Sequence, residues 1–200
     1  MAVVINLAHI SERDASEGYD GPVPVLQRRW EFDQLLKLYR EQAPRRTLEV
    51  GTYHGGTLYH WLTNAPAGAR VVSVDRPPPG VVQDEIFHRW APPRVDLRLL
   101  RGDSADPAMV SAAARFGPFE WIFLDAGHAA HEVRADWNNY SALAAPGGIV
   151  ALHDILPGRN AQAWIQVAPV WKEIQRDGYL TQEIVASEDV DWGGIGVVYL

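Results

Sequence analysis

The stretch Thr47-Leu48-Glu49-Val50-Gly51-Thr52-Tyr53-His54-Gly55-Gly56 decides the fold of this chain. Residues 47–50 form a short, mostly apolar run that predicts a buried strand, and Gly51 follows where the backbone must turn sharply. Gly55 and Gly56 carry no side chains where the next helix begins, so a ligand could approach the main chain there. A strand, a glycine-rich turn and a helix in this order predict a binding site for a nucleotide-like cofactor.

The glycine spacing disfavours NAD as that cofactor. The NAD fingerprint reads G-x-G-x-x-G, in which the second glycine lets a pyrophosphate approach the backbone. The glycines here read G-x-x-x-G-G between Gly51 and Gly56, so no glycine stands two positions after the first. An NAD-dependent oxidoreductase is therefore the weaker interpretation of this turn.

Length and composition describe a globular domain of ordinary polarity. The 200 residues are 47% hydrophobic and 22% charged, with a formal net charge of -7 at pH 7. The negative charge argues against a general nucleic-acid binder, so we expect a small-molecule partner. The chain has no cysteine, which excludes disulfides, thiolate metal sites and a cysteine nucleophile.

We expect a soluble, cytoplasmic protein, because the sequence shows no signal that directs it elsewhere. The first residues lack the basic region of a signal peptide. No apolar run approaches the roughly 20 residues that a membrane span needs. The sequence leaves open whether the protein forms a homo-oligomer.

Apolar runs and helical patterns alternate along the chain. The apolar runs predict five strands, at residues 47–50, 70–75, 95–100, 121–124 and 149–152. Helices between them require right-handed crossovers and a parallel sheet that is covered on both faces. Two more strands near residues 181–185 and 195–200 predict a closing hairpin. The expected fold class is a doubly wound α/β fold with a mostly parallel seven-stranded sheet and an antiparallel last strand.

The chain is predicted to divide at residue 29. Residues 11–29 are polar and interrupted by glycine and proline, so we expect residues 1–29 to form an irregular arm that could cover an active site. Residues 30–200 contain all the predicted strands and would form the catalytic domain.

Polar residues gather at the carboxyl ends of the five strands, where parallel sheets bind ligands. They are Glu49 and Gly51, Asp75, Asp103 and Ser104, Asp125 and His128, and His153 and Asp154. Any one acid could simply cap the next helix. Five consecutive strands that end this way favour a shared crevice.

Five motifs in order resemble the class I S-adenosylmethionine-dependent methyltransferases. They read LEVGTYHGG, VVSVD, RGDS, FLDAGHAAHEVRADW and LAAPGGIVALHDI, and the likeness covers residues 30–200. Within that class the motifs look like the family of the macrocin-type and mycinamicin-type O-methyltransferases and the cephalosporin-hydroxylase-like proteins. The resemblance implies a Rossmann-like methyltransferase fold and S-adenosyl-L-methionine as the cofactor.

The resemblance also implies roles for the residues at the strand ends. The backbone of Gly51, Thr52, Tyr53 and Gly55 would pass close to the methionine part of the cofactor. Glu49 would support this loop and receive the ammonium group, and Asp75 would accept both ribose hydroxyls. Asp103 and Ser104 would meet the adenine edge, and Asp125 would complete the cofactor-binding residues.

Methyl transfer also needs an acceptor oxygen that is aligned and made nucleophilic. Asp125 and Asp154 end adjacent strands, so a cation such as Mg²⁺ or Mn²⁺ could bridge them and hold the acceptor hydroxyls. His153 would be a further ligand, and His128 would be the base. The chain departs from the family where His153 replaces an acid and Gly127 replaces the second acid of D-G-D-H.

These residues together predict an O-methyltransferase that acts on a hydroxyl of a sugar or phenolic secondary metabolite, assisted by a divalent metal. One alternative is a catalytically silent module that binds S-adenosylmethionine and regulates or scaffolds a partner enzyme. A hydrolytic metal site built from Asp125, His128, His153 and Asp154 is a further alternative, which the cofactor-like first half of the chain disfavours.

Overall fold

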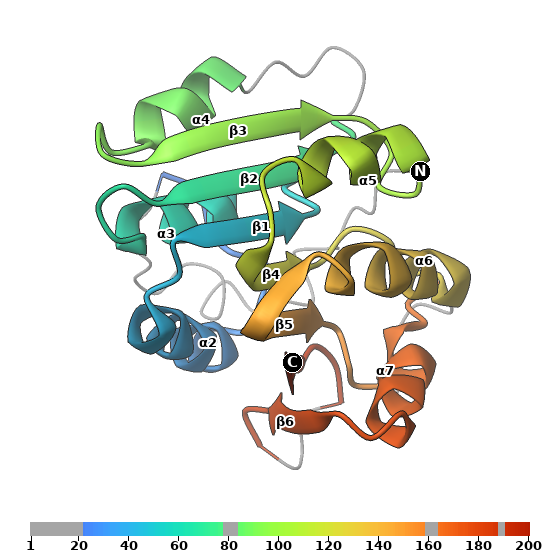
Figure 1. The fold of residues 1–200 in the computed structure, drawn as a ribbon. Coiled ribbons are helices and arrows are strands. Elements are labelled where there is room, and N and C mark those ends of the chain that lie inside the picture. Colours follow the sequence, from blue (N-terminus) through green and yellow to red (C-terminus); the bar gives the residue numbers. More distant parts are fainter. Residues whose placement is uncertain (1–21, 78–83, 159–163, 188–190) are drawn as a thin grey trace.

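The computed structural model describes residues 22–77, 84–158, 164–187 and 191–200. A seven-stranded sheet with helices on both faces forms this structure (Figure 1). The strands are β1 (Arg46–Val50), β2 (Arg70–Asp75), β3 (Asp96–Arg101), β4 (Phe119–Leu124), β5 (Ala144–His153), β6 (Leu180–Ile184) and β7 (Ile195–Tyr199). The helices are α2 (Arg29–Gln42), α3 (Gly56–Asn64), α4 (Asp84–Trp90), α5 (Pro107–Ala114), α6 (Ala130–Ser141) and α7 (Val167–Arg176). None of the described helices is both long and apolar enough to cross a membrane.

The strand order is β3-β2-β1-β4-β5-β7-β6, and it confirms the predicted fold class. Strand β1 pairs in parallel with β2 on one side and with β4 on the other. Strand β7 runs antiparallel to both β5 and β6, so the predicted closing hairpin is also confirmed. The chain therefore reverses its winding direction between β1 and β4, which is where doubly wound sheets bind their ligands.

Alternating side chains of the central strands form one apolar layer on each face of the sheet. Leu48 and Ile122 point to the face that α6 and α7 cover, while Trp121 and Phe123 point to the face that α2 and α3 cover. All four side chains are fully buried. The two layers hold the strands rigidly, so the residues at the strand ends keep fixed positions.

Two helices show how single residues fit their positions. Helix α7 begins at Val167, so Pro169 lies in the first turn, where its missing N–H costs no helical hydrogen bond. On α4, Phe87 is buried and Ile86 is 38% exposed, so Phe87 is the residue that this helix packs into the core.

Gly51 forms the contact between β1 and the end of β4. Its φ is +96°, and a Cβ there would lie 2.2 Å from the backbone oxygen of Asp125. A Cβ on Gly55 would likewise collide with the rings of Phe87 and Trp90, and a Cβ on Gly56 would collide with the carbonyl of Pro24. At Gly55 and Gly56 the missing side chains thus make room for protein atoms, while the approach of a ligand to this backbone stays a prediction. All three glycines let other parts of the protein pack against the turn.

Gly51→Ala should destabilise the fold more than the same change at a glycine with open surroundings. Positive φ costs alanine about 1–2 kcal/mol, and the clash with Asp125 should add about 1–3 kcal/mol. Gly147→Ala is the matched control, because Gly147 has φ +76° and no atom within 4 Å of the point where a Cβ would lie. Urea unfolding of both variants measures the difference, and equal losses would show that the contact with Asp125 is unimportant.

Candidate functional site

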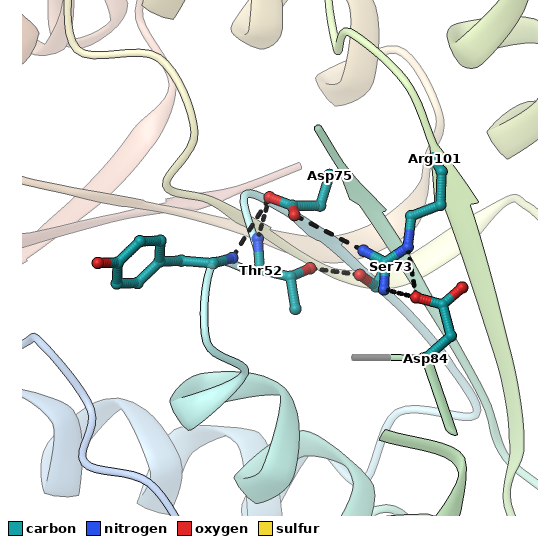
Figure 2. A network of polar contacts seen from close by, with 6 residues as sticks. Thr52, Ser73, Asp75, Asp84 and Arg101 are labelled. Carbon is teal, nitrogen blue, oxygen red and sulfur yellow. Dashed lines mark hydrogen bonds and ion pairs between the residues drawn. The ribbon is translucent and has the colours of Figure 1, made fainter. Parts of the chain in front are cut away.

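The carboxylate of Asp75 holds the turn after β1 in place (Figure 2). Its Oδ1 accepts the backbone N–H groups of Thr52 at 3.1 Å and Tyr53 at 3.3 Å. The guanidinium of Arg101 lies 3.6 Å from Asp75 Oδ2 and also bonds Asp84 at the start of α4. Asp75, predicted to bind ribose, therefore lies beside the predicted cofactor turn and also fixes the backbone of that turn.

Glu49 lies completely buried beneath the same turn. Its Oε1 accepts hydrogen bonds from the Thr57 hydroxyl at 2.6 Å and the Trp61 indole N–H at 2.9 Å. Its Oε2 is buried with no hydrogen-bond partner among the described residues. Burial raises the pKa of Glu49 to about 8, although these hydrogen bonds lower it. An ammonium group near Oε2 would supply the missing partner, so Glu49 fits its predicted role toward the cofactor.

The predicted adenine-side residues follow β3 and are tied to their surroundings. Asp103 pairs with Arg76 at 2.6 Å and accepts the N–H of Ala105 at 3.0 Å. The backbone carbonyl of Ser104 accepts the hydroxyl of Tyr140, on α6, at 2.9 Å. These contacts place the loop after β3 at the same sheet edge as Asp75.

Asp136 on α6 is a functional candidate that the sequence interpretation missed. It is 3% exposed and hydrogen-bonds both Ser104 and the backbone of Gly127. Burial raises its pKa to about 6, and these two hydrogen bonds act in the opposite direction. Asp136 thus joins the adenine-side loop to the loop that carries Asp125 and His128. Its helical spacing from Val133 and Tyr140, which predicts a buried position for an acid, was the only signal in the sequence.

Two acids and two histidines meet at the ends of β4 and β5. His128 Nε2 lies 3.2 Å from Asp154 Oδ2, and His153 Nδ1 lies 3.3 Å from Asp125 Oδ1. His153 Nδ1 also lies 3.5 Å from Asp154 Oδ2, so the four side chains form one connected cluster. Asp154 has φ +63°, an uncommon backbone conformation that is consistent with a functional position. The structure therefore brings together all four residues that were predicted at these strand ends.

The acids and histidines of this cluster shift one another's pKa values toward the charged forms. Burial lowers the pKa of His153, but Asp154 and Asp125 outweigh it and raise the value to about 9. Burial likewise opposes protonation of His128, yet its contact with Asp154 leaves the pKa raised. The pKa of Asp154 is lowered by the two imidazoles despite its own burial. The raised pKa values favour the protonated form of both imidazoles beside the Asp154 carboxylate, so a histidine that acts as a base must first lose its proton.

The geometry of the cluster can surround a cation. One ligand atom from each of Asp125, His128 and Asp154 lies within 4.8 Å of the others. The predicted metal ligands were Asp125, Asp154 and His153, whereas this grouping contains His128 in place of His153. Because two carboxylate oxygens and an imidazole nitrogen converge here, the residues fit a divalent cation, and the nitrogen suits Mn²⁺ better than Mg²⁺.

Gln27 also contacts the acid-histidine cluster, and the sequence interpretation did not identify it. Its Nε2 donates to Asp125 Oδ2 at 2.6 Å, and its side chain is almost completely buried. Neighbouring Val25 is buried in the core while Pro22 and Pro24 are exposed, so only part of this segment packs beside the site. The composition predicts an irregular arm that could cover a site, but it does not predict which residue contacts Asp125.

Sequence comparison places this fold and site in a known family. A family model described as a methyltransferase domain matches residues 48–155, more than half of the chain. The chain therefore belongs to this methyltransferase family. No curated protein matches the sequence.

Solved structures share the fold at low sequence identity. An O-methyltransferase from Bacillus cereus in complex with SAH has a TM-score of 0.64 at 18% identity, over 85% of this chain and 80% of that one. TomG, an O-methyltransferase from Streptomyces achromogenes solved with SAM, has a TM-score of 0.63 at 18% identity, over 90% and 83%. The mycinamycin-pathway methyltransferase MycE, solved with Mg and SAH, has a TM-score of 0.56 at 22% identity, over 84% of this chain but 47% of its own.

Family and fold together define a class I S-adenosylmethionine-dependent methyltransferase. This confirms the class that the five sequence motifs resemble. The cofactor turn after β1 and the acid-histidine cluster lie at neighbouring strand ends, which is the arrangement that transfer between a cofactor and an acceptor requires.

Glu49→Gln should make the free energy of unfolding less dependent on pH. The folded pKa of about 8 lies above the ordinary value of 4.5, so the folded state holds the proton more tightly. Wild-type stability should therefore fall as the pH rises from about 4.5 to 8, by up to about 4 kcal/mol, and glutamine has no proton to lose. Urea unfolding without cofactor measures this slope. Exposed Glu85→Gln is the control, and a wild-type slope retained in Glu49→Gln would contradict the assignment.

Proposed function

We propose that the protein is an O-methyltransferase that transfers the methyl group of S-adenosylmethionine to a hydroxyl of a small molecule. The observation that carries the proposal is the pairing of His128 with Asp154 at 3.2 Å, beside Asp125 at the end of the neighbouring strand. A base held by a carboxylate suits removal of a hydroxyl proton. Phenols and sugars of secondary metabolism both offer such hydroxyls.

The residues around the turn after β1 would hold the cofactor. Glu49 Oε2 would accept the ammonium group, and the backbone between Gly51 and Gly55 would lie against the methionine part. Asp75 would accept ribose hydroxyls while Arg101 keeps its carboxylate in place. Asp103 and Ser104 would border the adenine. The support for these roles is that all these groups lie at the carboxyl ends of β1, β2 and β3.

In the proposed reaction, His128 Nδ1, the ring nitrogen that does not face Asp154, takes the proton of the acceptor hydroxyl as the oxygen attacks the methyl carbon and the bond from that carbon to the sulfonium sulfur breaks. Asp154 orients the imidazole and stabilises the imidazolium that forms. His153 lies beside Oδ1 of Asp125, and Gln27 donates a hydrogen bond to Oδ2, so each carboxylate oxygen of Asp125 has its own partner. A divalent cation held by the carboxylates of Asp125 and Asp154 would bind the acceptor hydroxyl and lower its pKa, while His128 serves as the base.

A silent cofactor-binding module is the second candidate. The observation that favours it is the mutual pairing of the cluster, because two imidazoles already satisfy the two carboxylates. Such a module would bind the cofactor but would release no methyl group to any acceptor. Turnover therefore separates the two candidates.

His128→Gln should lower the rate of methyl transfer by about 10²- to 10⁴-fold, because it removes the general base. Binding of S-adenosylhomocysteine, measured by calorimetry, should not change, since His128 is not one of the residues proposed to hold the cofactor. His131→Gln is the matched control, because His131 is exposed three positions away. Transfer of a radiolabelled methyl group to a panel of phenols and sugars provides the rates. An unchanged rate in His128→Gln would sink the assigned base, and no cofactor binding in the wild type would sink the function.

EDTA should abolish methyl transfer, and Mg²⁺ or Mn²⁺ should restore it. The reason is that the cation would bind the acceptor hydroxyl and lower its pKa, which makes the oxygen a better nucleophile. Binding of Mn²⁺, followed by electron paramagnetic resonance, should be lost in Asp154→Asn and retained in Asp96→Asn, whose carboxylate lies at the opposite end of the sheet. If chelation leaves the rate unchanged, the metal is not part of the mechanism although the methyltransferase assignment stands.

A further inference from the structure

A recess opens directly beside the acid-histidine cluster. It has a volume of about 60 Å³, and its lining residues are Leu26, His153, Asp154, Leu156, Ile165, Trp192 and Gly193. His153 and Asp154 form its polar end, and Asp154 is the residue that contacts His128. A molecule that enters the recess therefore meets Asp154, the partner of the predicted base, at one end only. The rest of the described lining is apolar apart from the indole N–H.

The tryptophan side of the recess is fixed by buried contacts. The guanidinium of Arg28 lies 4.1 Å from the centre of the Trp192 ring, close enough for a cation-π interaction. The completely buried carboxylate of Glu31 accepts the N–H of Gly194 at 3.0 Å and the N–H of Ala186 at 3.0 Å. The N–H of Leu156 donates to the carbonyl of Gly193 at 3.0 Å, which ties the two sides together. The indole is thus held in position before any ligand arrives, which lowers the entropic cost of binding.

We infer that this recess binds the methyl acceptor, and that the acceptor is an uncharged aromatic ring with a hydroxyl on the edge that enters. This inference rests on the proposed O-methyltransferase function. A hydroxyl at the leading edge meets Asp154, whose carboxylate contacts His128, while the flat face of the ring contacts Trp192 and the aliphatic side chains. The small volume admits the edge of a ring and leaves the remainder of the molecule outside.

A sugar fits the described lining less well. A sugar ring carries hydroxyls around its whole perimeter, and each one loses hydrogen bonds to water when it is buried. Leu26, Leu156 and Ile165 offer no replacement, so a buried hydroxyl beside them would be unpaired. The recess therefore selects between the two acceptor classes that the sequence left open.

Matched small probes test the assignment on the protein saturated with S-adenosylhomocysteine. The probes are catechol, cis-cyclohexane-1,2-diol and methyl glucoside, each titrated by ligand-observed NMR with Mg²⁺ present and absent. Catechol should bind at least about threefold to tenfold more tightly than the non-aromatic diol. Tighter binding of the glucoside, equal binding of the two diols, or no binding of catechol at millimolar concentration would overturn the inference.

Variants on two sides of the recess separate a binding role from a structural one. Trp192→Ala should remove the preference for catechol over the saturated diol, and Trp30→Ala, a change at a half-exposed tryptophan on α2, should keep it. If Trp192→Ala does not fold, Leu156→Asn on another side of the recess should weaken catechol binding while binding of S-adenosylhomocysteine stays intact. An unchanged catechol preference in the folded variants would overturn the inference. Loss of S-adenosylhomocysteine binding in the wild type would instead contradict the proposed function.

Discussion

The close approach of Gly51 to the backbone of Asp125 is the constraint on which the rest of the site depends. A side chain at Gly51 would lie 2.2 Å from the Asp125 carbonyl, so β1 and β4 can end side by side only because this residue is glycine. Backbone hydrogen bonds from Gly51 to Val74 and from Asp125 to Val50 then fix both strand ends. The predicted cofactor turn and the loop that carries the catalytic candidates are therefore built on one contact.

Buried charge is the second organising principle of the site. A buried charge is costly unless it is paired, and here the carboxylates of Asp125 and Asp154 are paired with two imidazoles. Gln27 and Glu31 extend this pairing to the two sides of the site, since Gln27 bonds Asp125 and Glu31 bonds the backbone of Ala186 and Gly194. Segments near both ends of the described chain are thereby held against the same strand ends.

Features of the structure that depend on local sequence patterns could be predicted from the sequence. The strands were predictable because each is a short apolar run between turn residues. Gln27 and Asp136 were not, because their roles come from partners 98 residues away for Gln27 and in two separate loops for Asp136. The packing partners of Gly55 and Gly56 were hidden for the same reason: the sequence shows a missing side chain but not which atoms fill its place.

The sequence by itself determined the fold class, the strand ends and the chemical types of residue at those ends, because these follow from local periodicity and from the rule that parallel strands share a ligand-binding edge. Only the tertiary structure decided which of these groups touch. It paired His128 with Asp154 and His153 with Asp125, placed Gln27 on Asp125, and set Trp192 beside the cluster. The physical reason is that contacts between distant segments depend on how whole layers pack, and no local pattern encodes that packing.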